Sequence, residues 1–499
     1  MSEQDTTLPL KREIQNIISC THGGLVKKTA QKHGILEQDM LDLSASLNPI
    51  GSPFEYPAGN PYLDLHEILQ KAIAQIDQYP DNRYIDFRNS AAGFVGMGVQ
   101  PDNIIPGNGS SEVIRLVAEC VIEKDDIVLI PQPTFSEYEQ QCRIFGANVI
   151  YVKQDEITNI TDDLLEKARI LFVCNPNNPT GILMSRKEML DIVQRCEKNK
   201  TLLFVDEAFI ELSDPMQSVA DIAAENDYVF VLRSLTKSFA IPGIRIGFGI
   251  ASFKMAQMLD AARLPWNLGS IPDMVGTKLL GMDGGCNSLY LTESRELIKQ
   301  ESEYLTERLS NIRGFSPLPS GVNYILVDVS DFLMDSVELT HRLASHGILI
   351  RDCSSFYSLD NNYVRIAVRS REENDRLMKM IGEVLNEWGK QHAEEELKNT
   401  LEAVAKGMHS GRDTCEYYPC HFKDQDCTFC FCPFYACEDG RTGGKWIERS
   451  SGGKVWSCVD CHIMHNSEVS QRVLDVLMNK GTTEDNLKTA WESMVEPLL

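Results

Sequence analysis

Five short runs of almost continuously apolar residues constrain the fold of this chain more than any other feature of its sequence. They are IVLI at 127–130, NVIYV at 148–152, ILFV at 170–173, LLFV at 202–205 and VFVL at 229–232. Runs of this length are typical of strands that are buried on both faces. Helical patterns such as 111–123 and 186–199 separate them, and this alternation predicts an α/β domain around a mainly parallel sheet. Functional side chains in such sheets lie just beyond the carboxyl ends of the strands.

The pattern changes after about residue 290. A long amphipathic helix is followed by predicted strands near 322–328, 347–351 and 363–368 and by a helix from 372 to about 389. These elements predict a smaller α+β unit. The segment 392–407 is charged and strongly helix-forming until Gly407, which indicates a connector into a separate C-terminal domain.

The net charge and the hydropathy pattern argue against two kinds of binding partner, nucleic acids and membranes. The 499 residues include 48 Lys and Arg against 72 Asp and Glu, a net charge of -24 that would repel a nucleic-acid backbone or an anionic membrane. No apolar run approaches the roughly 20 residues needed to span a bilayer, and the first residues lack the pattern of a signal peptide. We therefore expect a cytoplasmic protein with no nucleic-acid or membrane partner, in which a few local cations hold any anionic substrate.

A lysine after the last apolar run carries the first chemical signal. Lys237 lies among small hydroxyl residues in RSLTKSFAIPGIRIGF, eight residues before Arg245, which suits a nucleophilic amine beside an anion site. Asp206 ends the run LLFVD, where a carboxylate could pair with a ring nitrogen. The turn-rich segment CNPNNPTG at 174–181 offers an amide, and PGNGSSE at 106–112 places small residues at a helix N-terminus that favours phosphate.

These motifs, in this order and spacing, resemble the fold-type I pyridoxal phosphate enzymes, in the branch that contains histidinol-phosphate aminotransferase. The resemblance covers about residues 20–388. Within that branch the chain is most similar to the threonine-phosphate decarboxylase family of cobamide biosynthesis, through the following segments: HGG at 22–24, DLSASLNPIG at 42–51, PTFSEY at 133–138, PWN at 265–267 and IRDCSSFYSLDNNYVRIAVRSREEN at 350–374.

The resemblance implies a role for each matching residue toward the cofactor, pyridoxal 5'-phosphate. Lys237 would hold the cofactor through an imine, and Asp206 would pair with its ring nitrogen. Asn178 matches the amide that contacts the ring hydroxyl, and Phe135 matches the aromatic residue stacked on the ring. The phosphate cradle is matched by Ser110, Ser234, Thr236 and Arg245, with backbone help from Gly109 and Ser111.

The same resemblance implies substrate contacts and a homodimer. Arg351 and Arg365 match the arginines that clamp the substrate carboxylate and phosphate, and His22 and Asn48 are additional candidate contacts, as is Asn178. Tyr79 matches a tyrosine that reaches the cofactor phosphate of the neighbouring subunit, which implies shared active sites.

The implied reaction is decarboxylation of L-threonine O-3-phosphate to (R)-1-amino-2-propanol O-phosphate and carbon dioxide. Two positions depart from the pattern. Ser46 stands where the family commonly has an amide, which puts any contact of that amide in doubt, and Phe209 stands where aminotransferases of the branch often carry a tyrosine. The alternatives are an aminotransferase acting on histidinol phosphate or an aromatic amino acid, and a metal-binding regulator that senses the cofactor. A sensor would not need both Lys237 and Asp206, so we favour the lyase.

Together the pattern and the resemblance predict five segments. They are 1–60, an N-terminal arm and part of the small domain; 61–290, the large cofactor-binding domain; 291–388, the small domain; 389–410, a helical connector; and 411–499, a cysteine-rich domain.

Eight of the 15 cysteines fall in this last segment. Their short spacings, together with two histidines, are typical of zinc sites, and thiolates also hold iron-sulfur clusters, so the metal stays open. A disulfide framework is disfavoured by the expected compartment. The predicted ligands are Cys415, Cys420, Cys427, Cys430, Cys432, Cys437, Cys458, Cys461, His462 and His465.

The domain could be a structural or regulatory cap, or it could assist a second reaction. Phosphorylation of L-threonine by ATP is the candidate second reaction, because it would supply the substrate of the decarboxylase. The chain has no G-x-x-x-x-G-K-[ST] loop, so such a kinase would need another nucleotide site.

Overall fold

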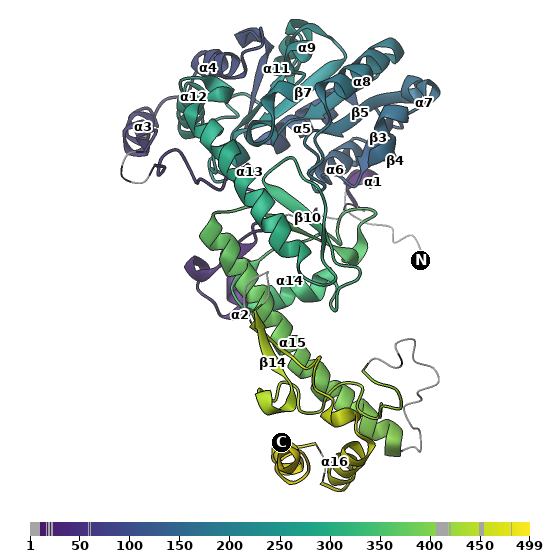
Figure 1. The fold of residues 1–499 in the computed structure, drawn as a ribbon. Helices are drawn as coiled ribbons and strands as arrows, with labels where there is room; N and C mark the ends of the chain where they lie inside the picture. The colour runs from purple at the N-terminus through teal and green to yellow at the C-terminus, as the bar shows by residue number, and fades with distance from the viewer. Residues whose placement is uncertain are drawn as a thin grey trace. The chain divides into compact units, whose positions relative to one another are not determined.

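A seven-stranded sheet forms the centre of the larger unit of the chain (Figure 1), with the strand order β2-β8-β7-β6-β5-β3-β4. The computed structural model describes residues 10–15, 17, 20, 23–57, 59, 61–405, 418, 421–448, 454–480 and 482–499. The sheet consists of β2 (Ile104–Gly107), β3 (Ile127–Gln132), β4 (Asn148–Lys153), β5 (Ala168–Cys174), β6 (Leu202–Asp206), β7 (Val229–Ser234) and β8 (Gly247–Ile250). All neighbours pair in parallel except at β8, which is antiparallel to both β2 and β7.

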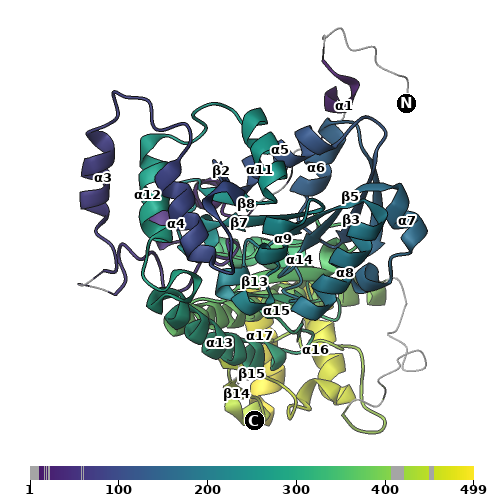
Figure 2. The same cartoon turned by 90° about the horizontal axis from the view of Figure 1, so that it is seen from above.

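The five strands expected from the apolar runs are confirmed, and their alternate residues enter two different hydrophobic layers. Leu203 and Val205 of β6 belong to one layer, whereas Leu202 and Phe204 belong to the other. Figure 2 shows α5 (Ser110–Val121), α6 (Glu137–Ile144) and α11 (Phe253–Ala262) on one side of the sheet, with α8 (Arg186–Asn199) and α9 (Ala220–Glu225) on the other. Burial on both faces explains why the runs carry no polar alternation.

A four-stranded antiparallel sheet forms the small domain of the same unit, in the order β12-β13-β10-β9. Its strands are β9 (Ser316–Pro317), β10 (Tyr324–Asp328), β12 (Arg351–Asp352) and β13 (Tyr363–Ala367), accompanied by α13 (Leu289–Ser310) and α14 (Ser336–Ser345). The N-terminal segment joins this part of the molecule, because β1 (Leu41–Asp42) pairs in parallel with β11 (Ile348–Leu349).

The chain divides into two compact units, Met1–Asn374 and Asp375–Leu499. The helix that we expected to end near residue 389 is α15 (Arg371–Ala405), a single helix of 35 residues. Gly389 does not end it, although glycine in a helix costs about 1 kcal/mol relative to alanine. A Cβ at this position would lie 2.9 Å from the ring of Tyr435, so the glycine makes room for that ring.

The remaining elements of the second unit surround a small apolar core. A hairpin of β14 (Lys445–Glu448) and β15 (Lys454–Ser457) is followed by α16 (Ser467–Lys480) and α17 (Glu484–Ala490). Buried side chains of the core include Leu397, Phe429, Val473 and Leu477. No helix in the described part of the chain is long and apolar enough to cross a bilayer.

Candidate active site

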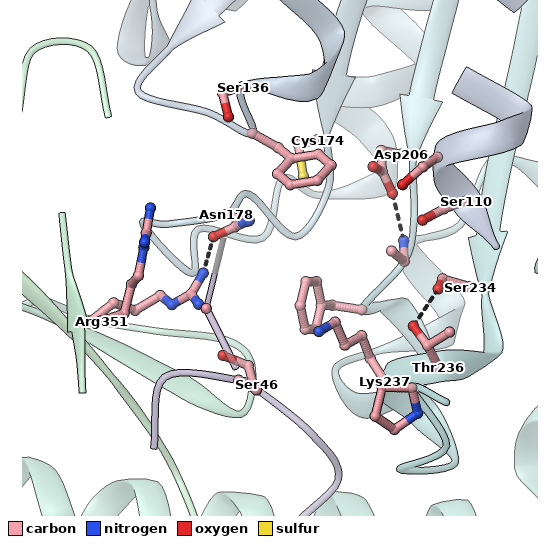
Figure 3. Close-up of a pocket in the computed structure, with 18 of the residues that line it drawn as sticks. Ser46, Ser110, Ser136, Cys174, Asn178, Asp206, Ser234, Thr236, Lys237 and Arg351 are labelled. Atoms are coloured by element: carbon pink, nitrogen blue, oxygen red, sulfur yellow. Dashed lines mark hydrogen bonds between the residues drawn. The ribbon is translucent and has the colours of Figure 1, made fainter. Parts of the chain in front are cut away.

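A cavity of about 320 Å³ lies at the carboxyl ends of β5, β6 and β7 and extends to the small-domain sheet. Most of the predicted cofactor and substrate residues line it: Ser110, Ser111, Phe135, Asn178, Asp206, Ser234, Thr236, Lys237, Arg245, Arg351 and Arg365. Figure 3 shows the cavity, with Asp206, Lys237 and Arg351 among the labelled side chains. Asp206 is the only carboxylate among the described residues that line the cavity, whereas four lysine or arginine side chains line it. The cavity is therefore suited to a ligand that carries several negative charges.

Lys237 lies on α10 (Leu235–Ser238), the short helix that directly follows β7. Burial lowers the pKa of its amine to about 8, and the nearby guanidinium groups of Arg365 and Arg245 act in the same direction. A substantial fraction of the amine is therefore neutral near physiological pH and can attack a carbonyl carbon.

Asp206 ends β6 and is almost fully buried. Its Oδ1 accepts a hydrogen bond of 2.9 Å from the backbone N–H of Ala208, and its Oδ2 accepts one of 2.6 Å from the Tyr138 hydroxyl. Burial raises the pKa of the carboxyl to about 6, while these two hydrogen bonds lower it. The carboxylate is thus held in one orientation at the inner end of the cavity.

The N-terminus of α5 provides a site for a phosphate group. Ser110 and Ser111 open the helix and line the cavity, and the first N–H groups of a helix have no partner within it. Gly109 precedes them with a φ of +77°, and a Cβ there would lie 2.6 Å from Nη2 of Arg245. The glycine therefore lets the Arg245 guanidinium lie against the turn.

Ser234 and Thr236 complete this part of the site. Their hydroxyls lie 2.9 Å apart within hydrogen-bond distance of each other, and both residues are buried. The predicted phosphate cradle is thus assembled from two segments, the turn before α5 and the turn after β7.

Two arginines come from neighbouring strands of the small domain. Arg351 of β12 and Arg365 of β13 are register partners, and both are buried. Arg351 donates a 2.7 Å hydrogen bond to Ser355, and Arg365 donates to the carbonyl of Ser44 at 2.8 Å. Arg365 also donates to the Asn178 side-chain oxygen, a hydrogen bond that the dashed line at Asn178 marks in Figure 3.

Unsatisfied polar atoms remain at this end of the cavity. Among the described residues, the buried Ser46 hydroxyl and the Nε of Arg365 have no hydrogen-bond partner, and both residues line the cavity. A buried polar group without a partner costs free energy that a bound ligand can recover.

Two aromatic residues occupy the positions that the sequence singled out. Phe135 lines the cavity and meets Tyr138 edge to face, with ring centroids 5.6 Å apart. Phe209 is buried in the cavity wall and packs edge to face on Tyr324 at 5.1 Å.

Several predicted residues lie elsewhere. Asn48 is fully buried and does not line the cavity. Its amide donates a 2.8 Å hydrogen bond to the carbonyl of Ser238, the residue after Lys237. Tyr79 is 79% exposed and stacks on Trp266, away from the cavity of its own chain. His22 lies outside the described residues, although Gly23 lines the cavity.

Sequence reasoning missed three of the cavity's polar residues, Ser44, Ser136 and Tyr138. Tyr138 stands in PTFSEY, three residues after Phe135, and lies on α6, which begins two residues after Phe135. Its place in this motif was the one signal that the sequence offered. Ser44 gave no signal of its own, because its carbonyl rather than its side chain contacts Arg365.

In the second unit, four of the predicted metal ligands line a single small cavity: Cys432, Cys437, Cys458 and Cys461. Apolar residues surround them, including Phe434 and Trp491. Burial raises the pKa of Cys432, and the three other thiols of this cavity raise it further.

The two histidines predicted as metal ligands, His462 and His465, lie near a third histidine, His421. The rings of His462 and His465 lie 5.3 Å and 4.3 Å from that of His421. Cys427 and Cys430 do not line the thiol cavity, and Cys415 and Cys420 lie outside the described residues. Within the described ranges, no three His, Cys, Asp or Glu side chains are placed so that they could hold a metal ion.

Comparison with known proteins identifies the family. Residues 55–381 match the aminotransferase class I and II family, and residues 407–488 match the cysteine-rich small domain family. The chain therefore belongs to the class I and II aminotransferase family and carries a cysteine-rich small domain at its C-terminal end. The predicted fold-type I architecture is confirmed.

Individual relatives divide between two activities. A histidinol-phosphate aminotransferase of Methanococcus aeolicus is 28% identical over 72% of this chain and 94% of its own length. A putative threonine-phosphate decarboxylase of Caldanaerobacter subterraneus is 32% identical over 66% of this chain and 86% of its own length. Most of the other similar proteins are named histidinol-phosphate aminotransferases.

The fold is also that of a solved cofactor complex. The histidinol-phosphate aminotransferase of Sinorhizobium meliloti, crystallised with pyridoxal-5'-phosphate, superposes with a TM-score of 0.63 over 75% of this chain and 96% of its own, at 20% identity.

Proposed function

We propose that this chain is a pyridoxal-phosphate-dependent decarboxylase of L-threonine O-3-phosphate, acting in the cytoplasm as part of cobamide biosynthesis. The observation that carries the proposal is the pairing, in one cavity, of a lysine and a buried carboxylate with two adjacent arginines from the small domain.

The cavity residues fit the proposed cofactor. Lys237 supplies the amine for its aldehyde, Asp206 supplies an acceptor for its ring nitrogen, and the α5 N-terminus with Arg245 supplies donors for its phosphate. Gly109 keeps the space of that phosphate turn free of a side chain. When bound, the protonated cofactor ring accepts the electron pair of whichever bond at the substrate Cα is broken.

The substrate residues bind and orient two anionic groups. Arg351 and Arg365 are register partners on neighbouring strands and both line the cavity, and planar guanidinium groups bind carboxylate and phosphate through paired hydrogen bonds. Holding both groups of the phosphorylated amino acid at once fixes the rotation about its Cα. We expect this clamp to present the bond between Cα and the carboxylate for cleavage, so that carbon dioxide would leave.

Phe209 favours decarboxylation over transamination. It lines the cavity where aminotransferases of the branch often carry a tyrosine, and a phenylalanine brings no hydroxyl to that point of the wall. Lys237, whose pKa is lowered to about 8, can return a proton to the substrate carbon after carbon dioxide has left.

The deciding experiment compares two products from one substrate. The full chain is loaded with pyridoxal phosphate and incubated with L-threonine O-3-phosphate, with and without 2-oxoglutarate, and carbon dioxide and keto acid are both measured. We expect carbon dioxide and (R)-1-amino-2-propanol O-phosphate in equal amounts, independent of the added acceptor. Keto acid that forms only with 2-oxoglutarate would contradict the proposal.

An aminotransferase acting on histidinol phosphate is the second candidate, because most of the similar proteins carry that name. Incubation with histidinol phosphate and 2-oxoglutarate tests it, since the aminotransferase would form glutamate and the decarboxylase would not. The candidate second reaction, phosphorylation of L-threonine by ATP, is not part of the proposal.

Two further parts of the proposal concern assembly and the tail. The stacked Tyr79 and Trp266 are exposed, which suits a homodimer in which Tyr79 reaches the neighbouring site. We also propose that the tail holds zinc or an iron-sulfur cluster through its cysteines, a proposal supported by their spacing in the sequence.

A further inference from the structure

Tyr138 contacts the buried carboxylate of the site without being assigned any role by the family resemblance. It lies on α6, is fully buried, and donates a 2.6 Å hydrogen bond from its hydroxyl to Oδ2 of Asp206. A buried tyrosine hydroxyl needs a partner, and a hydrogen bond to an ionised carboxylate is stronger than one between neutral groups.

The surrounding residues fix this hydroxyl in place. The Tyr138 ring stacks on Phe172 with centroids 5.0 Å apart and an interplanar angle of 14°, and it lies 6.2 Å from Phe204. Its other edge meets Phe135, the residue expected to stack on the cofactor ring. One rigid side chain thus connects the aromatic wall of the cavity to Asp206.

The hydrogen bond acts on the charge state of Asp206 as well as on its orientation. Burial favours the neutral carboxyl and is the main reason why the pKa of Asp206 is raised, to about 6 with its hydrogen bonds in place. The hydrogen bonds from Tyr138 and from the backbone of Ala208 stabilise the anion and lower that pKa. Only the anion of Asp206 can pair with a protonated ring nitrogen. The hydrogen bond from the Tyr138 hydroxyl to Asp206 therefore helps to keep the cofactor ring protonated and able to accept electrons.

We infer that Tyr138 is a positioning residue, which orients Asp206 toward the ring nitrogen of the cofactor and holds it as the anion. The inference rests on the proposed cofactor but not on which of the two reactions the chain catalyses. The nearby Cys174 does not take over this role, because its thiol donates to the carbonyl of Pro176.

The test replaces the hydroxyl while keeping the ring. We expect Tyr138→Phe in the full chain to weaken pyridoxal phosphate binding at least about tenfold, since hydrogen bonds to charged groups are among the stronger ones. We also expect kcat to fall while KM changes little, because the residue does not contact the substrate. The pH midpoint of the cofactor's visible absorption should rise, because a less positive ring withdraws fewer electrons from the Lys237 nitrogen.

Tyr84→Phe is the matched control. Tyr84 is also a buried tyrosine of the first unit, but its hydroxyl donates to the backbone carbonyl of Leu268 away from the cavity. We expect this variant to lose stability while keeping cofactor affinity and the absorption midpoint. In an Asp206→Asn background, Tyr138→Phe should produce no further loss of cofactor affinity.

The outcomes separate this inference from the proposed function. If the wild-type chain binds no pyridoxal phosphate, the proposed cofactor is wrong. If the wild type binds it, and Tyr138→Phe binds it equally well with an unchanged midpoint, the inference is wrong. If Tyr138→Phe fails to fold, 4-methylphenylalanine and 4-aminophenylalanine at position 138 fill the same space, and only the second, which retains an N–H donor, should restore affinity.

Discussion

The pKa of Lys237 makes the capture of the cofactor depend on pH. Burial and two neighbouring guanidinium groups lower this pKa to about 8, so the neutral, nucleophilic amine forms well below the pH at which an exposed lysine loses its proton. We expect the rate of covalent cofactor capture to rise about tenfold per pH unit up to pH 8 and then to level off. Stopped-flow absorbance with the cofactor-free protein between pH 6 and 9 measures this dependence.

Lys237→Arg provides the control, because it keeps a positive charge but offers no nucleophilic amine. It should show no covalent capture at any pH, and borohydride should leave no cofactor attached to it. A wild-type rate that continues to rise toward pH 10 would mean that the amine keeps its ordinary pKa.

The two small-domain arginines should determine substrate binding. Arg351→Gln removes one guanidinium group from the clamp, and hydrogen bonds to charged groups contribute roughly 1.5–3 kcal/mol each. We expect KM for the phosphorylated amino acid to rise about 10- to 100-fold, with cofactor affinity unchanged, as measured by steady-state kinetics and by cofactor titration. Arg342→Gln, which breaks a partly exposed i,i+4 pair with Glu338, should leave KM unchanged. Equal KM values for the two variants would contradict the assigned clamp.

Sequence alone could predict the residues that carry charge or a motif, but not those whose role comes from packing. Asp206 ends β6 and Lys237 follows β7, so both lie at the edge of the parallel sheet where its strands end. The two arginines belong to the other sheet, and their charge and motif rather than their position in a strand made them candidates. The role of Asn48 could not be predicted in this way, because three of its hydrogen bonds go to Ser238, Tyr290 and Ser294, which are remote in the sequence. No local pattern indicates such partners.

At the scale of the elements, the turn before α5 should tolerate only glycine at position 109. Its φ of +77° is rarely adopted by other residues, and a Cβ would meet the Arg245 guanidinium at 2.6 Å. A residue held in such a backbone region costs about 1–3 kcal/mol. We expect Gly109→Ala to lower the free energy of unfolding by this amount and to weaken cofactor binding, as measured by denaturant titration and fluorescence.

Gly243→Ala is the matched control, because it lies in the same part of the site near Arg245. A Cβ at Gly243 meets no atom within 4 Å, and its φ is not in the left-handed region. This variant should behave as the wild type. A loss of affinity in both variants would show that the region tolerates no added side chain for some other reason.

Among the strands, β2 and β8 could not be predicted from hydropathy. β8 reads GFGI, and two of its four residues are glycines, which are depleted in strands. The structure gives the reason at Gly249, where a Cβ would lie 2.3 Å from the Phe230 ring of the neighbouring strand. The large phenylalanine takes the space that a side chain of β8 would have used, so the strand is specified by its neighbour and not by its own propensity.

For the whole molecule, the two units lead to separate expectations for the cofactor and the metal. The cofactor cavity is lined entirely by residues of Met1–Asn374, and the thiol cavity by residues of Asp375–Leu499. We therefore expect chelation of the metal to unfold part of the second unit while the cofactor absorption persists. Metal analysis of the full chain, followed by hydrogen exchange with and without chelator, measures both.

Replacement of a single cysteine should affect the stability of the second unit without affecting the first. Metal sites in small domains supply much of their folding free energy, and loss of one ligand weakens such a site. Cys458→Ser should therefore lower the metal content and expose the amides of the second unit, whereas Cys120→Ser, at an exposed thiol of the first unit, should change neither. Cofactor affinity should be the same in both variants. Full metal content in Cys458→Ser would show that the four thiols around this cavity are not the ligands, and the remaining cysteines and histidines of the tail would then have to hold the metal.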